Sequence, residues 1–87
     1  MTSILQLKTK TIPALKRLQK HIGSNHEMSA KLKSITMLIQ SHVDLEMPFY
    51  SCQYDEVIRI LKNWGDAAEY RGDDTELRLI EDVRWSA

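Results

Sequence analysis

The sequence of 87 residues contains one cysteine, two prolines, three glycines and one phenylalanine. A single cysteine excludes a disulfide within the chain and is typical of a protein from a reducing compartment. No apolar run approaches the roughly 20 residues that a membrane-spanning helix needs, and the first residues lack the apolar core and cleavage site of a signal peptide. We therefore expect a cytoplasmic protein with no membrane segment.

Repeats, linkers and low-complexity tracts are also absent. Hydrophobic residues make up 43% and charged residues 28% of the chain, which are ordinary values for a globular domain. At this length the chain is expected to form one domain, residues 1–87, that buries little more than half of the surface exposed in its unfolded state. Its stability is therefore expected to be small.

The net charge is zero, yet the two signs are separated along the chain. Residues 1–42 carry seven lysines and arginines against one acid, whereas residues 43–87 carry five against eleven acids. Such a separation can steer a charged partner, or the two halves can attract each other within the fold. The residues that would form a basic face are Lys16, Arg17, Lys20, Lys31 and Lys33.

Two amphipathic helices are predicted in the first half. Pro13 stands where the first turn of a helix tolerates proline, apolar residues follow at helical spacing, and Gly23 provides a stop. Ser24 and Glu27 match a capping box, which predicts that a second helix follows directly. The residue before Pro48 avoids helical dihedral angles, so this second helix is expected to end there.

A third helix is predicted from about Tyr54 to Trp64. Asp55 and Glu56 suit the positive end of its dipole, and Gly65 is the predicted stop. The apolar stripes of the second and third helices should meet at the centre of the core. The residues expected there are Leu32, Ile35, Ile39, Val57, Leu61 and Trp64.

Two short segments lie beside these helices. Residues 4–7 fit either a helical turn or a short edge strand, and the pattern does not choose between them. Phe49 and Tyr50 lie in the loop between the second and third predicted helices. We expect these two rings to plug the core rather than to form a binding platform.

The hydrophobic period changes after Gly65. Apolar and polar residues begin to alternate, the segment 72–74 has the glycine and aspartates of a turn, and Leu77 and Leu79 then lie on one side of a strand pattern. This pattern predicts a β-hairpin over residues 67–80. The expected fold is therefore α+β, with a three-helix core followed by a C-terminal hairpin.

The same stretch also fits a fourth helix. Asp74 or Thr75 would cap it, Leu77, Ile80 and Val83 would face the core, and the domain would be all-α. Under the hairpin hypothesis, strand alternation defines an outward row that faces solvent or a partner. Its members are Glu69, Arg71, Glu76 and Arg78.

Residue patterns for catalysis, metal binding or cofactor binding are missing. The soft metal ligands are His21, His26, His42 and Cys52, and their spacings match no zinc pattern. No base stands near Cys52 in the sequence to activate it as a nucleophile. Without a convergent acid, base, nucleophile or phosphate loop, we expect a non-enzymatic protein with no cofactor.

Three helices followed by a hairpin resemble the winged helix, in which the third helix enters the DNA major groove and the hairpin lies beside it. The resemblance implies a DNA-binding regulator. Asp55 and Glu56 begin the third helix here and the turn at 72–74 is acidic, which disfavours contact with phosphate. Protein contact, a second use of the winged helix, suits these charges better.

A second resemblance is to the PUB (or PUG) domain, a helical module with a small sheet. The segment 31–35, KLKSI, is similar to the K-[YF]-R-x-I motif of that family, and residues 57–65 with 77–79 are similar to its last helix, glycine turn and closing strand. The resemblance implies binding to the C-terminal tail of the valosin-containing AAA ATPase. Residues 36–39, TMLI, replace the family's asparagine-x-x-phenylalanine, so no pocket residue is carried over.

These patterns favour a small module or regulator that binds another protein. One alternative is a winged-helix DNA-binding regulator. Another, which requires the fourth helix, is a small inhibitor or immunity-type protein that acts through its acidic C-terminal half. The sequence does not name the partner, and it leaves a homodimer open.

Overall fold

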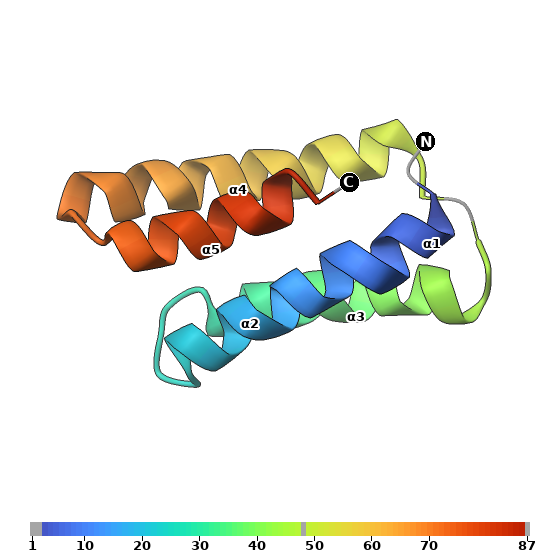
Figure 1. The fold of residues 1–87 in the computed structure, drawn as a ribbon, viewed down its shortest axis with the longest axis horizontal. Helices are drawn as coiled ribbons and strands as arrows, with labels where there is room; N and C mark the ends of the chain where they lie inside the picture. Colours follow the sequence, from blue (N-terminus) through green and yellow to red (C-terminus); the bar gives the residue numbers. More distant parts are fainter. Residues whose placement is uncertain (1–2, 48, 87) are drawn as a thin grey trace.

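Helices form almost all of the chain that the computed structural model describes, residues 3–47 and 49–86 without the side chain of Ser51 (Figure 1). In chain order they are α1 (Ile4–Gln6), the π-helical turn η1 (Leu7–Thr11), α2 (Ile12–Ile22), α3 (Ser29–Asp44), α4 (Ser51–Arg71) and α5 (Asp74–Arg84).

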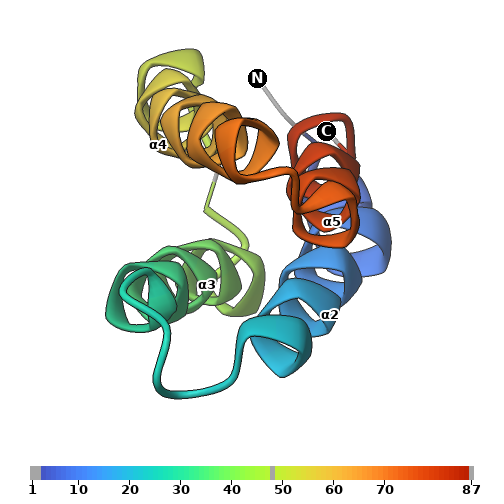
Figure 2. The same cartoon turned by 90° about the vertical axis from the view of Figure 1, so that its left-hand side faces the viewer.

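The helices run alternately up and down and form a bundle (Figures 1 and 2). The first three elements make one continuous rod, in which the backbone N–H of Ile12 donates to the carbonyl of Leu7. α2 packs against α3 and α5, and α4 packs along α5. α3 and α4 are not among the closely packed pairs, and Figure 2 shows them apart at one edge of the bundle.

One apolar cluster fills the space between the helices. It contains all six residues predicted for its centre, so the apolar stripes of the second and third predicted helices are confirmed. Phe49 is also fully buried, and its ring packs edge-on against the rings of His42 and Tyr54. Tyr50 is exposed, so only the first of the two predicted aromatic plugs is correct.

The ends of the first helices agree in part with their predictions. α2 contains Pro13 in its first turn and ends before Gly23, whose φ is 69°. Residues 4–7 are helical and lead into α2 without a break, which excludes the edge strand. α3 ends at Asp44, and Pro48, the predicted stop, lies outside the described residues.

α3 begins at Ser29, and the capping box predicted at 24–27 is wrong. The loop before α3 is held by His26 instead. The imidazole Nδ1 of His26 accepts the backbone N–H of Met28 at 3.0 Å, and its Nε2 lies 2.8 Å from a carboxylate oxygen of Glu76 in α5. A tertiary contact has therefore overridden the local capping pattern.

α4 does not end at Gly65, where the sequence predicted a stop. Glycine inside a helix costs about 1 kcal/mol relative to alanine, but the next turn places Ala68 in the core. Gly65 faces α5, and a Cβ built on it would lie 3.5 Å from Leu77 Cδ1 and 3.7 Å from Ile80 Cγ2. The helix ends at Gly72 instead, whose φ of 75° is a left-handed conformation that glycine adopts without strain.

Residues 74–84 form the helix α5, so the predicted hairpin and the α+β fold are wrong. Asp73 caps this helix, since its carboxylate accepts the backbone N–H of Glu76 at 3.1 Å. The buried positions of α5 follow helical spacing and are Glu76, Ile80 and Val83. Because the first of these positions is a glutamate, the sequence does not show a complete apolar stripe at helical spacing. The pattern therefore predicted Leu77 and Leu79 as the inward residues of a strand.

The winged-helix and PUB-like folds both need strands after the third helix. Every described residue from 66 to 86 is helical or lies in a short turn. Both expectations of fold are therefore wrong. The fourth-helix alternative agrees with α5, although Asp73 rather than Asp74 or Thr75 is its cap.

Candidate functional site

A groove of about 450 Å³ runs between α3 and α4, at the edge where these two helices are not closely packed. Its lining is mainly apolar because both helices turn part of an apolar stripe toward it. Ile35 and Val57 are buried and form its floor, whereas Leu38 and Ile60 are more exposed and stand at its sides. The exposed Cys52 lies at one end.

A second hollow of about 320 Å³ continues the groove toward the start of α3. It shares Lys31 and Ile60 with the first hollow and is also lined by Trp64 and Ala67 of α4. Together the two hollows follow α4 from Cys52 to Ala67. That span corresponds to about 22 Å, or about four helical turns.

The two walls of the groove carry unlike charges. Lys31 stands on the α3 wall and forms no ion pair with any residue that the structure describes. Glu56 stands on the α4 wall, and the exposed Arg59 donates to its carboxylate at 2.6 Å. An exposed pair of this kind contributes little to stability, so Glu56 can change partners at small cost.

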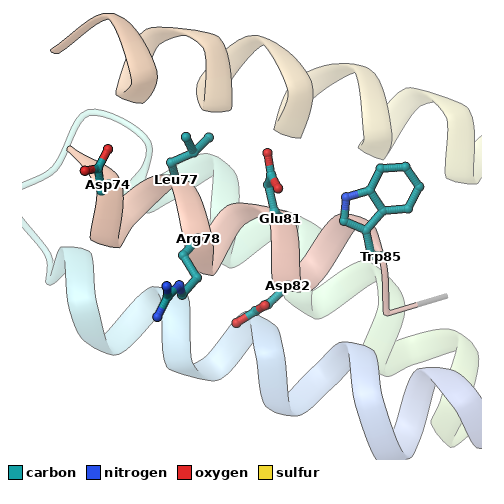
Figure 3. A pocket seen from close by; sticks show the side chains of 6 residues that line it. All are labelled: Asp74, Leu77, Arg78, Glu81, Asp82 and Trp85. Atoms are coloured by element: carbon teal, nitrogen blue, oxygen red, sulfur yellow. The ribbon is translucent and has the colours of Figure 1, made fainter. Parts of the chain in front are cut away.

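The outer face of α5 forms a more polar hollow of about 440 Å³ (Figure 3). Its acids are Asp74, Glu81 and Asp82. In Figure 3, Glu81 and Trp85 point toward α4, whereas Arg78 and Asp82 point toward α2. Trp85 is 74% exposed, and the guanidinium carbon of Arg84 lies 5.3 Å from the centre of its ring. This face offers charge and one aromatic ring rather than a mainly apolar lining.

A buried carboxylate joins three segments at one end of the bundle. Glu76 of α5 is only 2% exposed, His26 contacts one of its oxygens, and Arg71 of α4 pairs with the other. Because Nδ1 of His26 accepts a backbone N–H, Nε2 carries the proton that points toward Glu76. The His26 ring also packs against Trp64, with ring centres 5.5 Å apart. The cluster fixes the loop before α3 onto α4 and α5.

The four residues predicted as an outward row do not form one. Glu69 and Arg78 are exposed on two different helices, and Arg78 lines the hollow on α5. Arg71 is bound to Glu76, which is buried rather than outward. The row depended on strand alternation, and the helical spacing of α5 turns Glu76 inward. The sequence did not identify His26 as the partner of this carboxylate.

The five residues predicted as a basic face are all exposed but do not share one face. Lys16, Arg17 and Lys20 belong to the solvent side of α2. Lys33 lies at a crevice between α2 and α3, whereas Lys31 lies in the groove between α3 and α4. Within the described chain none of the five pairs with an acid, and the contact between a basic and an acidic side chain that joins the two halves is that of His26 with Glu76.

Chemical groups for catalysis or metal binding are sparse. Across residues 3–47 and 49–86, no three side chains of histidine, cysteine, aspartate or glutamate gather as a metal site. Burial raises the pKa of Tyr54, and the nearby positive charge of Arg84 partly opposes that effect. The Tyr54 hydroxyl donates to the backbone carbonyl of Arg84 at 3.0 Å, and this hydrogen bond joins the start of α4 to the end of α5. Of the helices described, none has the length and apolar character needed to cross a membrane.

Comparisons of the chain with protein-family models, with curated proteins and with solved structures give no match. Neither the PUB nor the winged-helix resemblance gains support from them. The function is therefore inferred from the surfaces described above.

Proposed function

We propose that this protein is a non-enzymatic interaction module that holds an apolar helix of a partner protein in the α3–α4 groove. The observation that supports this function is the apolar groove at a bundle edge where two successive helices are not closely packed. Recognition of a helix in a groove uses this geometry, since apolar side chains at helical spacing enter the hollow together. The single cysteine is consistent with a cytoplasmic site of action.

The lining of the groove defines the chemistry of its occupant. The length of the two hollows suits a helix of about four turns with apolar residues at i, i+3, i+4 and i+7. An acid on the occupant would complement Lys31, and a base would complement Glu56 on the opposite wall. Apolar contact would provide affinity, and the two charges would fix the direction of the helix.

Cys52 allows a direct test of groove occupancy because it is exposed and lies at the groove. An environment-sensitive fluorophore on this thiol should respond saturably to a synthetic amphipathic helix with leucines at the spacing given above. Leu38→Glu places a charge at the side of the groove and should weaken the response by at least about tenfold, equivalent to about 1.4 kcal/mol. Leu5→Glu is the matched control, because Leu5 is exposed on α1 and does not line the groove.

The same variants apply to the natural partner. A photoreactive group on Cys52 should cross-link a helical segment of one protein from the source cell, in the parent and in Leu5→Glu but not in Leu38→Glu. If Leu38→Glu and Leu5→Glu bound the peptide and the partner equally well, the groove would not be the binding site.

The acidic face of α5 favours a second candidate function, that of a small inhibitor or immunity-type protein. Acids and Trp85 are exposed along one helix, a surface that complements a basic partner. Glu81→Lys with Asp82→Lys should abolish binding under this alternative and leave it unchanged if the groove is the site. Leu38→Glu should give the opposite pattern.

A further inference from the structure

α3 carries a second apolar stripe on its solvent side, separate from the stripe that it buries in the core. The exposed fractions of Met37, Leu38 and Leu45 are 62%, 42% and 67%. Ser34 and Ser41 complete the stripe, and their hydroxyls donate to backbone carbonyls one turn earlier in α3 at 3.1 and 2.9 Å. Neither hydroxyl needs a further acceptor, so the stripe is neutral and can be covered without leaving a buried donor unpaired.

This stripe is self-complementary about the point midway between Met37 and Leu38. Counting outward from that point, Ser34 corresponds to Ser41 and Ala30 corresponds to Leu45, and all of these residues are exposed. A two-fold axis through the point lays α3 antiparallel on α3 of a second copy. Each serine then faces a serine, which allows close approach, and each leucine or methionine meets an apolar or small residue.

The same axis brings unlike charges together. Lys31 and Asp44 are both exposed and lie at equal distances from the midpoint along the sequence. Lys31 forms no ion pair within the described chain, and Asp44 accepts a hydrogen bond from Gln40 at 2.8 Å. An antiparallel pair therefore places Lys31 of each copy beside Asp44 of the other, whereas a parallel pair would place like charges together.

We infer that the occupant of the α3–α4 groove is a second copy of this chain, docked antiparallel through α3. The inference rests on the proposed function, because Ser34 and Leu38 belong both to the stripe and to the lining of the groove. α3 of the second copy covers the stripe and lies along α4. Its Lys31 then lies toward the C-terminal end of α3, where Asp44 provides negative charge and Glu56 stands on the facing wall of the groove.

The expected contact is small. α3 has 16 residues, so it extends about 24 Å, and one such helix pair with a flanking wall falls short of the roughly 1,600 Å² of a standard interface. We therefore expect a dimer that dissociates between about 10 µM and about 1 mM, a range that corresponds to a weak interface. Salt should weaken it further, because the two end contacts are exposed ion pairs.

Charge exchange at Lys31 and Asp44 tests the geometry by sedimentation equilibrium. Lys31→Asp or Asp44→Lys alone sets like charges against each other at both ends and should weaken self-association at least about tenfold. An equimolar mixture of the two variants restores unlike charges at both ends, so it should dimerise as tightly as the parent chain. Both changes suit the helix dipole, since an acid is favourable near the start of α3 and a base near its end.

Leu38→Glu should abolish the dimer, and Leu5→Glu should leave it unchanged. Thermal melts by circular dichroism establish that each variant is folded. A parent chain that remains monomeric at about 1 mM would overturn the inference, because even weak specific contacts populate a dimer there. A mixture of Lys31→Asp and Asp44→Lys that associates no better than each variant alone would overturn it as well.

The fluorophore on Cys52 distinguishes failure of this inference from failure of the proposed function. A monomer whose groove still binds the amphipathic peptide retains the function and excludes the second copy. A groove that accepts neither peptide nor second copy excludes both.

Discussion

At the scale of single residues, Glu76 determines how the C-terminal helix is fixed to the rest of the molecule. Glu76→Gln keeps the shape of the side chain but removes the charge that His26 and Arg71 contact. Since hydrogen bonds to a buried charged group contribute about 1.5–3 kcal/mol each, we expect a loss of about 1–3 kcal/mol in the free energy of unfolding. Urea denaturation measures this loss. Glu69→Gln is the control, since Glu69 is exposed on α4 and its change should stay within about 0.5 kcal/mol.

A double-mutant cycle measures the interaction energy between His26 and Glu76 separately from their other contacts. Glu76→Gln and His26→Ala should show a coupling of about 0.5–3 kcal/mol, as residues in one hydrogen-bonded network do. Additive effects would mean that the loop before α3 is held mainly by the packing of the His26 ring on Trp64, and that the 2.8 Å contact contributes little.

At the scale of elements, the two glycines of α4 should respond in opposite directions to alanine. Gly65 lies inside the helix, and a Cβ there meets α5 only at ordinary van der Waals distance, so Gly65→Ala should stabilise the protein by up to about 1 kcal/mol. Gly72 has a φ of 75°, so Gly72→Ala should destabilise it by about 1–2 kcal/mol. Thermal melts of the two variants test this prediction. If Gly65→Ala melted at a lower temperature than Gly72→Ala, Gly65 would be needed for close packing of α4 on α5.

The success of the sequence-based predictions also differs between elements. The stripes of α3 and of the first part of α4 were predictable because every buried position on them is apolar, as at Leu32, Ile39 and Leu61. α5 was predicted only as the alternative, because a buried acid occupies one of its core positions and local pattern cannot show that Arg71 and His26 will pair with it. The same contact explains why the capping box failed, since its energy comes from residues 50 positions away in the chain.

At the scale of the whole molecule, the groove could not be predicted from the sequence. Ile35 and Val57 were expected in the core, and they are buried there. Their second role, as the floor of a groove, depends on the spacing between α3 and α4, which the packing of α2 and α5 controls. A hydrophobic pattern indicates which face of a helix is apolar, but it does not indicate whether a neighbouring helix covers that face completely.

The distribution of charge over the molecule leads to a prediction about nucleic acid. The winged-helix arrangement is absent from the described chain, α4 begins with Asp55 and Glu56, and the face of α5 is acidic. Lys16, Arg17 and Lys20 form no ion pair with any described residue, and they provide only a short positive stripe along α2. We therefore expect DNA affinity no tighter than the non-specific range of about 10⁻⁴–10⁻⁶ M at physiological salt.

Fluorescence anisotropy with a labelled mixed-sequence duplex, measured over a range of salt concentrations, tests this expectation. Lys20→Glu should further weaken any residual binding, while Leu38→Glu should leave it unchanged because the groove takes no part. Sub-micromolar binding that falls steeply with salt and is lost in Lys20→Glu would contradict the prediction. Such binding would also indicate that the functional surface is α2 rather than the groove, because DNA phosphates bind lysine and arginine side chains and not an apolar hollow.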